Sequence, residues 1–127
     1  MSESSITVVS KRRVIVVDDE KVLATSLALI LNQAGFETHA MFSGEEAVDS
    51  LGRIQPDLLI TDVILPGMTG IETAIITRNK LPGCKILLFS GQAITADLLQ
   101  MAREQGHDFE FLSKPIHPSD LLDKMRD

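Results

Sequence analysis

The sequence predicts an α/β protein with a parallel central sheet that is covered by helices on both faces. Short apolar runs rich in β-branched residues recur along the chain, as is typical of strands buried on both faces. Each extended segment is followed by a segment with apolar residues at helical spacing. Five strand–helix pairs in strict alternation therefore predict a single-domain, doubly wound (βα)5 sandwich, in which right-handed crossovers are expected.

The first two strand–helix pairs are expected before residue 55. Residues 14–17 form a continuous β-branched run, and a helix from Lys21 should end at Gly35. Residues 36–42 are the second extended segment, although their alternation is weak. Ser43 and Glu46 fit a capping box, in which each side chain satisfies the other's backbone amide. The helix that they open is expected to end just before Gly52.

The remaining three pairs are delimited by Pro and Gly. The expected strands are residues 58–62, 85–89 and 109–112, and the expected helices are residues 70–80, 95–105 and 119–126. The helix over 70–80 should turn one side towards the core, with Ile71, Ala74, Ile75 and Arg78 along it. Pro118 suits the first turn of the final helix.

Composition limits the class of protein. A chain of 127 residues with 44% hydrophobic and 24% charged residues is one ordinary globular domain. Its net charge of −6 argues against binding to nucleic acid or to anionic membranes. No signal peptide is evident, and no apolar run reaches the roughly 18 residues of a membrane span. The single cysteine, Cys84, should be a small buried hydrophobe. These features together predict a cytoplasmic protein.

The two ends of the chain receive different readings. Residues 1–12 look like a flexible leader, and the basic cluster Lys11-Arg12-Arg13 is read as a solvated strand entry. The chain stops about one helix after Lys114-Pro115, so no output domain is expected within it.

Polar residues stand at the carboxyl ends of four expected strands. They are Asp18 and Asp19, Asp62, Ser90 and Lys114. In a parallel sheet these ends share one edge, where ligands bind. Clustered carboxylates repel one another, and a hard divalent cation such as Mg²⁺ is the simplest compensation. Such a site suits phosphoryl transfer onto an aspartate. Each residue also has an ordinary structural role, as a helix cap, a turn residue or a solvated lysine.

The motifs at this edge resemble those of the receiver domains of two-component response regulators, the CheY-like family. They are Val-Val-Asp-Asp-Glu at 16–20, Asp-Val-Ile-Leu-Pro-Gly-Met-Thr-Gly at 62–70, Ser90-Gly91 and Lys114-Pro115. The resemblance runs from Arg13 to the C-terminus and implies a receiver domain over residues 13–127. It also implies a flavodoxin-like fold with the strand order 2-1-3-4-5.

The resemblance implies a phosphoacceptor and a metal site. Asp62 matches the phosphoacceptor, and Asp19 matches the main acidic ligand of Mg²⁺, for which Mn²⁺ can substitute. Asp18 matches a ligand that acts through water. The main-chain carbonyl of Ile64 would complete the protein ligands.

The resemblance also implies a switch. Ser90 matches the hydroxyl that turns towards the phosphoryl group, and Lys114 matches the lysine that contacts it. The Lys114-Pro115 bond is typically cis in this family. Phe111 stands where the family more often has Tyr, and it either follows the hydroxyl inward or is plain core.

Ile64 and Gln92 occupy two positions that modulate access to the acceptor and the lifetime of the phosphoryl group in this family. Apolar Ile64 cannot hydrogen-bond an attacking water, whereas Gln92 can. We expect Ile64 to slow autodephosphorylation.

The sequence therefore predicts a phosphorylation-dependent signalling switch of a two-component phosphorelay and not an enzyme beyond its own phosphotransfer and autodephosphorylation. The expected phosphodonor is a sensor histidine kinase or a histidine phosphotransfer protein, and the downstream protein target is unknown. Neither nucleic acid nor membrane is expected as a direct partner. A monomer and a phosphorylation-dependent dimer both remain open, as do a stand-alone regulator and a piece of a longer protein.

Two other functions remain open. A Mg²⁺-dependent aspartyl-phosphate phosphatase would need a second acid two residues after Asp62, where Ile64 stands. A flavin- or nucleotide-binding module would need a phosphate loop after the first strand, where Asp18-Asp19-Glu20 repels phosphate.

Overall fold

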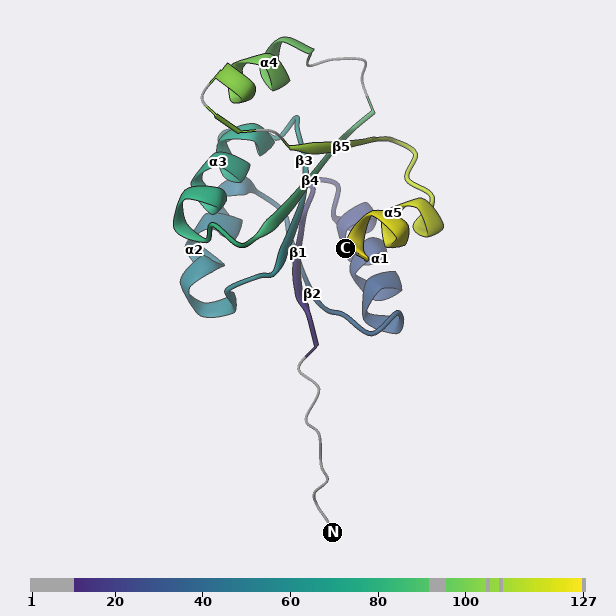
Figure 1. The fold of residues 1–127 in the computed structure, drawn as a ribbon. Helices are drawn as coiled ribbons and strands as arrows, with labels where there is room; N and C mark the ends of the chain where they lie inside the picture. The colour runs from purple at the N-terminus through teal and green to yellow at the C-terminus, as the bar shows by residue number, and fades with distance from the viewer. Residues whose placement is uncertain (1–10, 92–95, 105, 108, 127) are drawn as a thin grey trace.

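A five-stranded parallel sheet forms the centre of the protein (Figure 1). The computed structural model describes residues 11–91, 96–104, 106–107 and 109–126. The strands are β1 (Arg13–Val17), β2 (Glu37–Met41), β3 (Leu58–Asp62), β4 (Lys85–Ser90) and β5 (Glu110–Ser113). The helices are α1 (Lys21–Gln33), α2 (Gly44–Ile54), α3 (Gly70–Lys80), α4 (Ala96–Glu104) and α5 (Pro118–Met125). The strand order β2-β1-β3-β4-β5 confirms the predicted fold.

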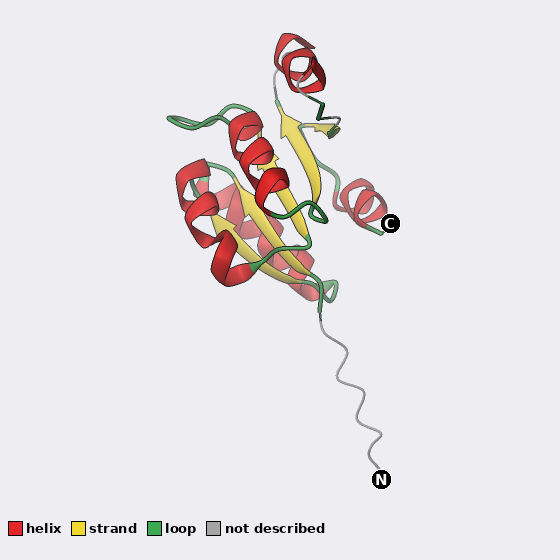
Figure 2. Ribbon diagram, turned by 60° about the vertical axis from the view of Figure 1, so that its left-hand side comes forward, coloured by secondary structure: helices red, strands yellow, loops and turns green. Residues whose placement is uncertain are grey.

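Helices cover both faces of the sheet, as Figure 2 shows. Alternate residues of each central strand point to opposite faces, so every strand contributes to two cores. In β1, Val14 and Val16 pack towards α1 and α5, whereas Ile15 and Val17 pack towards α2, α3 and α4. This double burial explains the continuous apolar runs of β1, β3 and β4.

The strand with weak alternation, β2, is an edge strand of the sheet. The backbone N–H of Glu37 bonds to β1, so those of Thr38 and Phe42 face the open edge. Side chains cover both of them: Asn32 Oδ1 accepts from Thr38 at 2.7 Å, and Glu46 Oε1 accepts from Phe42 at 2.8 Å. Only one side of β2 pairs with a strand, and this explains why its sequence departs from the pattern of the buried strands.

The capping box predicted at α2 is half right. Ser43 Oγ accepts from the Glu46 N–H at 3.0 Å, as expected. The Glu46 carboxylate reaches one residue further back, to Phe42 instead of Ser43. A complete capping box stands instead at the start of α3, where Thr69 and Glu72 satisfy each other's backbone N–H.

Two other details of the helices differ from the prediction. Helix α2 continues through Gly52 to Ile54 and ends at Gln55, whose φ of 50° is left-handed. Helix α3 buries Ile71 and Ala74 and packs Ile75 against the same core, as predicted, but it also buries Thr73 and Thr77, while Arg78 is half-buried. The two threonine hydroxyls donate to backbone carbonyls one turn earlier, so they can enter the core without losing hydrogen bonds.

Two arginines of the basic cluster bind the C-terminal ends of helices, a role that the reading as a solvated strand entry missed. Arg12 donates to the Met125 carbonyl of α5 at 2.8 Å, and Arg13 donates to the Ile54 carbonyl of α2 at 3.2 Å. Cationic groups are favourable at these ends because unpaired carbonyls gather there.

The predicted place of Cys84 is confirmed, since its side chain is buried. Burial raises the pKa of the Cys84 thiol to about 11. Within the part of the chain that the structure describes, no helix combines the length and the apolar character that a bilayer span requires.

Candidate functional site

The parallel sheet brings the predicted site residues to one edge. Asp18 directly follows β1, Asp62 ends β3, and Ser90 ends β4. Lys114 follows β5, and its N–H bonds to the Ser90 carbonyl at 2.9 Å. Asp62 and Phe89 are partners in the ladder between β3 and β4. This backbone pairing fixes the positions of Asp62 and Ser90 at the edge of the sheet.

The Lys114 ammonium joins two buried carboxylates. Its Nζ donates to Asp18 Oδ2 at 3.0 Å and to Asp62 Oδ2 at 2.9 Å. The other oxygen of each carboxylate accepts a backbone N–H two residues further on. Asp18 Oδ1 accepts from Glu20 at 2.9 Å, and Asp62 Oδ1 accepts from Ile64 at 3.1 Å. Both carboxylates are therefore held in a fixed orientation.

Burial and the ion pairs act in opposite directions on the titration of these groups. Burial raises the pKa of Asp62, and the bonds from Lys114 and Ile64 offset only part of this effect. For Lys114, burial is the largest single effect and lowers the pKa. The bonds to Asp62 and Asp18 together outweigh it, so the pKa of Lys114 is raised. The site therefore favours a cationic Lys114 and disfavours the ionised form of Asp62.

The carboxylates fit a hard divalent cation. Oxygen atoms of Asp18, Asp19 and Asp62 lie within 4.8 Å of one another. Asp18 and Asp62 are buried, whereas Asp19 is exposed. Lys114 supplies one positive charge against these three acids, and Glu20 adds a fourth carboxylate at 3.5 Å from its Nζ. An all-oxygen donor set with excess negative charge suits Mg²⁺.

The structure also places the other predicted site residues that it describes. Ser90 is buried, and Ile64, whose N–H bonds to Asp62, is 46% exposed. Phe111 is half-buried and packs against the core between the sheet and α2, α3 and α4. The Lys114-Pro115 peptide bond is cis. Gln92 lies outside the described residues.

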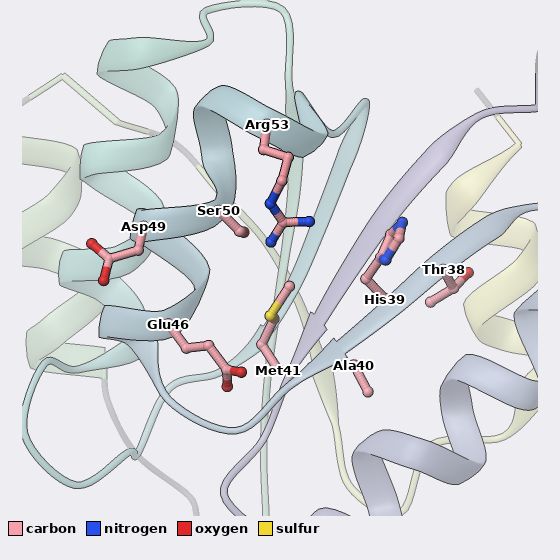
Figure 3. Close-up of a pocket in the computed structure, with 8 residues that line it drawn as sticks. All are labelled: Thr38, His39, Ala40, Met41, Glu46, Asp49, Ser50 and Arg53. Atoms are coloured by element: carbon pink, nitrogen blue, oxygen red, sulfur yellow. The ribbon is translucent and has the colours of Figure 1, made fainter.

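A groove of about 580 Å³ lies elsewhere, between β2 and α2 (Figure 3). Its lining combines the imidazole of His39 and the guanidinium of Arg53 with the acids Glu46 and Asp49. The groove shares no residue with the acidic cluster at the end of β1 and β3.

Sequence reasoning missed two acids near the site. Glu20 is part of the Asp-Asp-Glu motif, and its position next to two expected ligands could have indicated contact with Lys114. Glu45 on α2 accepts a hydrogen bond from Met68 N–H at 3.0 Å. No local pattern links these two residues, because they are 23 positions apart in the sequence.

The fold and the acidic edge define a CheY-like (βα)5 protein, and comparisons with known proteins agree. The sequence matches the family described as the response regulator receiver domain over residues 14–126. The response regulators named MtrA from Mycobacterium tuberculosis and Mycobacterium leprae are each 32% identical to it over 116 residues. This match covers 91% of the chain and 50% of each relative. The chain thus spans about half the length of the curated relatives it matches, and the DNA binding in their names is a property stated of those proteins.

Solved structures are also similar. A CheY-like receiver domain protein from Methanospirillum hungatei has a TM-score of 0.84 and 27% identity, with 92% of both chains covered. The chemotaxis protein CheY4 from Vibrio cholerae has a TM-score of 0.83 and 26% identity, with 92% of this chain and 98% of that chain covered.

The chain belongs to the receiver domain family of two-component response regulators. Receiver domains act as phosphoacceptors and not as conventional enzymes. Family membership thus decides among the classes that the sequence left open, against the phosphatase and the flavin- or nucleotide-binding module.

Proposed function

We propose that this protein is a phosphorylation-dependent signalling switch in which Asp62 accepts a phosphoryl group. The observation that carries the proposal is the bridging of Asp18 and Asp62 by Lys114 Nζ, at 3.0 and 2.9 Å. This contact joins residues from three places in the sequence: the segment after β1, the end of β3 and the segment after β5. It contains a carboxylate nucleophile and a cation that can bind a phosphoryl oxygen.

Asp18, Asp19 and Asp62 would hold Mg²⁺, together with the main-chain carbonyl of Ile64. When bound, the ion neutralises negative charge that develops on the phosphoryl oxygens. The chain's own contribution is orientation. The Ile64 N–H holds Asp62 Oδ1, and Lys114 holds Asp62 Oδ2, so the carboxylate faces the site before a phosphoryl group arrives.

The transfer forms one bond and breaks one bond. An oxygen of the Asp62 carboxylate attacks the phosphorus of a phosphohistidine, and the phosphorus–nitrogen bond breaks. The bonding electron pair leaves with the imidazole of the donor. The Lys114 ammonium, which now bonds to Asp62, then donates to an oxygen of the transferred group.

The switch proposed from the family involves Ser90 and Phe111. Ser90 ends β4, the strand that pairs with β3, and Phe111 is the partner of Leu88 in the ladder between β4 and β5. Movement of the Ser90 hydroxyl towards the phosphoryl group would thus be transmitted along β4 to Phe111 in the neighbouring strand β5. A change in the position of Phe111 would then alter the surface near β5.

The proposed partners are proteins. A sensor histidine kinase or a histidine phosphotransfer protein supplies the phosphoryl group, and a protein target reads the changed surface. The net charge of −6 supports protein contacts over direct contact of this chain with nucleic acid. We further propose that residues 13–127 make up the receiver domain.

The test is incubation with Mg²⁺ and acetyl phosphate, followed by intact mass measurement. We expect one phosphoryl addition to the wild-type protein and none to Asp62→Asn. The matched control is Asp49→Asn, an exposed acid on α2, which should be phosphorylated like the wild type. Absence of any addition to the wild-type protein, or undiminished addition to Asp62→Asn, would falsify the proposal.

A further inference from the structure

The loop that follows the phosphoacceptor is tied to the sheet at both ends. Val63 N–H donates to the Phe89 carbonyl of β4 at 2.9 Å, and Gly70 N–H donates to the Val63 carbonyl at 3.0 Å. Gly70 also lies directly against the backbone of Asp62, where any Cβ would overlap the Asp62 carbonyl oxygen. Residues 64–69 therefore form a loop whose two ends lie close together, and Ile64 lies at its start.

The far side of this loop is bound by Glu45, from the first turn of α2. Glu45 Oε2 accepts a hydrogen bond from Met68 N–H at 3.0 Å. By contrast, the N–H groups of Ile64 and Thr69 bond to Asp62 and Glu72, at most three residues away in the sequence. The Glu45 bond thus links the loop to a different helix, whereas the other two hydrogen bonds are local.

The packing around Glu45 shows that the contact is close. Gly67, with a φ of 75°, adopts a left-handed conformation under the carboxylate, and a Cβ there would lie 2.7 Å from Glu45 Oε2. A Cβ on Gly44 would overlap Thr73 Oγ1 of α3 and would lie 3.2 Å from the Met68 carbonyl oxygen. The hydrogen bond from Met68 is also the main reason why the pKa of Glu45 is lowered. Two glycines thus allow the first turn of α2 and the loop to approach each other.

We propose that Glu45 is a positioning residue for the phosphoacceptor loop, which it holds through Met68 N–H so that Ile64 is presented to the metal site. This role rests on the proposed function of Asp62 and its metal site. Glu45 touches neither the phosphoryl group nor the ion, and it acts through the backbone between Ile64 and Met68. Its removal should therefore weaken Mg²⁺ binding.

Three variants separate the hydrogen bond from the charge. Glu45→Ala removes both, and Glu45→Gln removes the charge but keeps an acceptor oxygen. Asp49→Ala is the matched control, because it removes an acid one turn further along α2 whose carboxylate points away from β2 in Figure 3. Thermal unfolding of each variant checks that it is folded.

The first measurement is amide hydrogen exchange at Met68 in the metal-free protein. In Glu45→Ala we expect exchange to accelerate about tenfold, whereas Glu45→Gln should stay within about threefold of wild type. Asp49→Ala should match wild type. Equal exchange at Met68 in wild type and Glu45→Ala would overturn the proposal, as would equal acceleration in Asp49→Ala or in Glu45→Gln.

The second measurement is Mg²⁺ affinity, followed by NMR because the chain has no Trp and no Tyr. We expect the Kd to rise about fivefold in Glu45→Ala and to recover in Glu45→Gln. An unchanged Kd in Glu45→Ala would overturn the role of Glu45 alone. If the wild-type protein binds no Mg²⁺, the proposed function itself fails, so the two failures are distinguishable.

Discussion

Lys114 and the carboxylates around it set the charge balance of the site at the scale of single residues. One ammonium contacts Asp18, Asp62 and Glu20, and all three acids compete for it. An exposed cluster of this kind would be screened by water, but Asp18 and Asp62 are buried. Burial of these carboxylates therefore costs stability, and a bound cation would offset this cost.

This cost in stability predicts the effect of neutralising Asp62. Because the pKa of Asp62 is raised in the folded protein, ionisation of this side chain is less favourable in the native state than in the unfolded chain. Its favourable contribution is complete below the ordinary pKa of 3.8 and is lost as pH rises through the raised value. Asp62→Asn should therefore be more stable than wild type at pH 7, and the difference should shrink below pH 4.

Urea unfolding of both proteins at pH 7 and pH 3.5 measures this difference. Asp49→Asn is the control, since its side chain is exposed. A lower stability of Asp62→Asn than of wild type at pH 7 would contradict the expectation.

Glycines of two helices have opposite roles at the scale of elements. Gly52 lies inside α2 with nothing within 4 Å of a built Cβ, whereas Gly70 begins α3 against the backbone of Asp62. Gly52→Ala should raise the free energy of unfolding by about 0.5–1 kcal/mol, since alanine favours helix. Gly70→Ala should lower it by more than about 2 kcal/mol, because backbone must move.

Denaturant unfolding of this pair tests the packing of α3 against β3. Each variant adds the same methyl group to a helical glycine, so the two are controls for each other. Similar stabilities of the two variants would show that the close approach at Gly70 is not required.

The order of strands and helices along the chain was predictable because local sequence pattern decides it. Buried strands such as β3 and β4 have continuous apolar runs, and motifs at their ends placed Asp62 and Ser90 correctly in the sheet. Where a contact depends on tertiary position, prediction failed. Gly52 suggested the end of α2, but packing of Ile54 into the core carries the helix further. Arg12, Arg13 and Glu45 bind backbone groups of distant elements, which no spacing in the sequence reveals.

At the scale of the whole molecule, cation binding should be linked to folding. The three carboxylates come from the ends of β1 and β3, so the site is assembled only when the sheet is formed. At a free Mg²⁺ concentration of a hundred times the Kd, the free energy of unfolding should increase by about 2.7 kcal/mol.

Thermal unfolding with and without Mg²⁺ measures this increase. Asp19→Asn removes the exposed acid of the cluster and should lose most of the effect. An equal gain in Asp19→Asn and wild type would indicate that Mg²⁺ stabilises the protein at another place.

The bond from Arg12 to the Met125 carbonyl has a consequence for the order in which the chain matures. Each strand of the sheet lies next to one made shortly before it, so the sheet can grow as synthesis proceeds. Arg12, however, waits for a partner 113 residues later. Met125 leaves the ribosome after every strand of the sheet, and its arrival allows the segment that enters β1 to bond to α5.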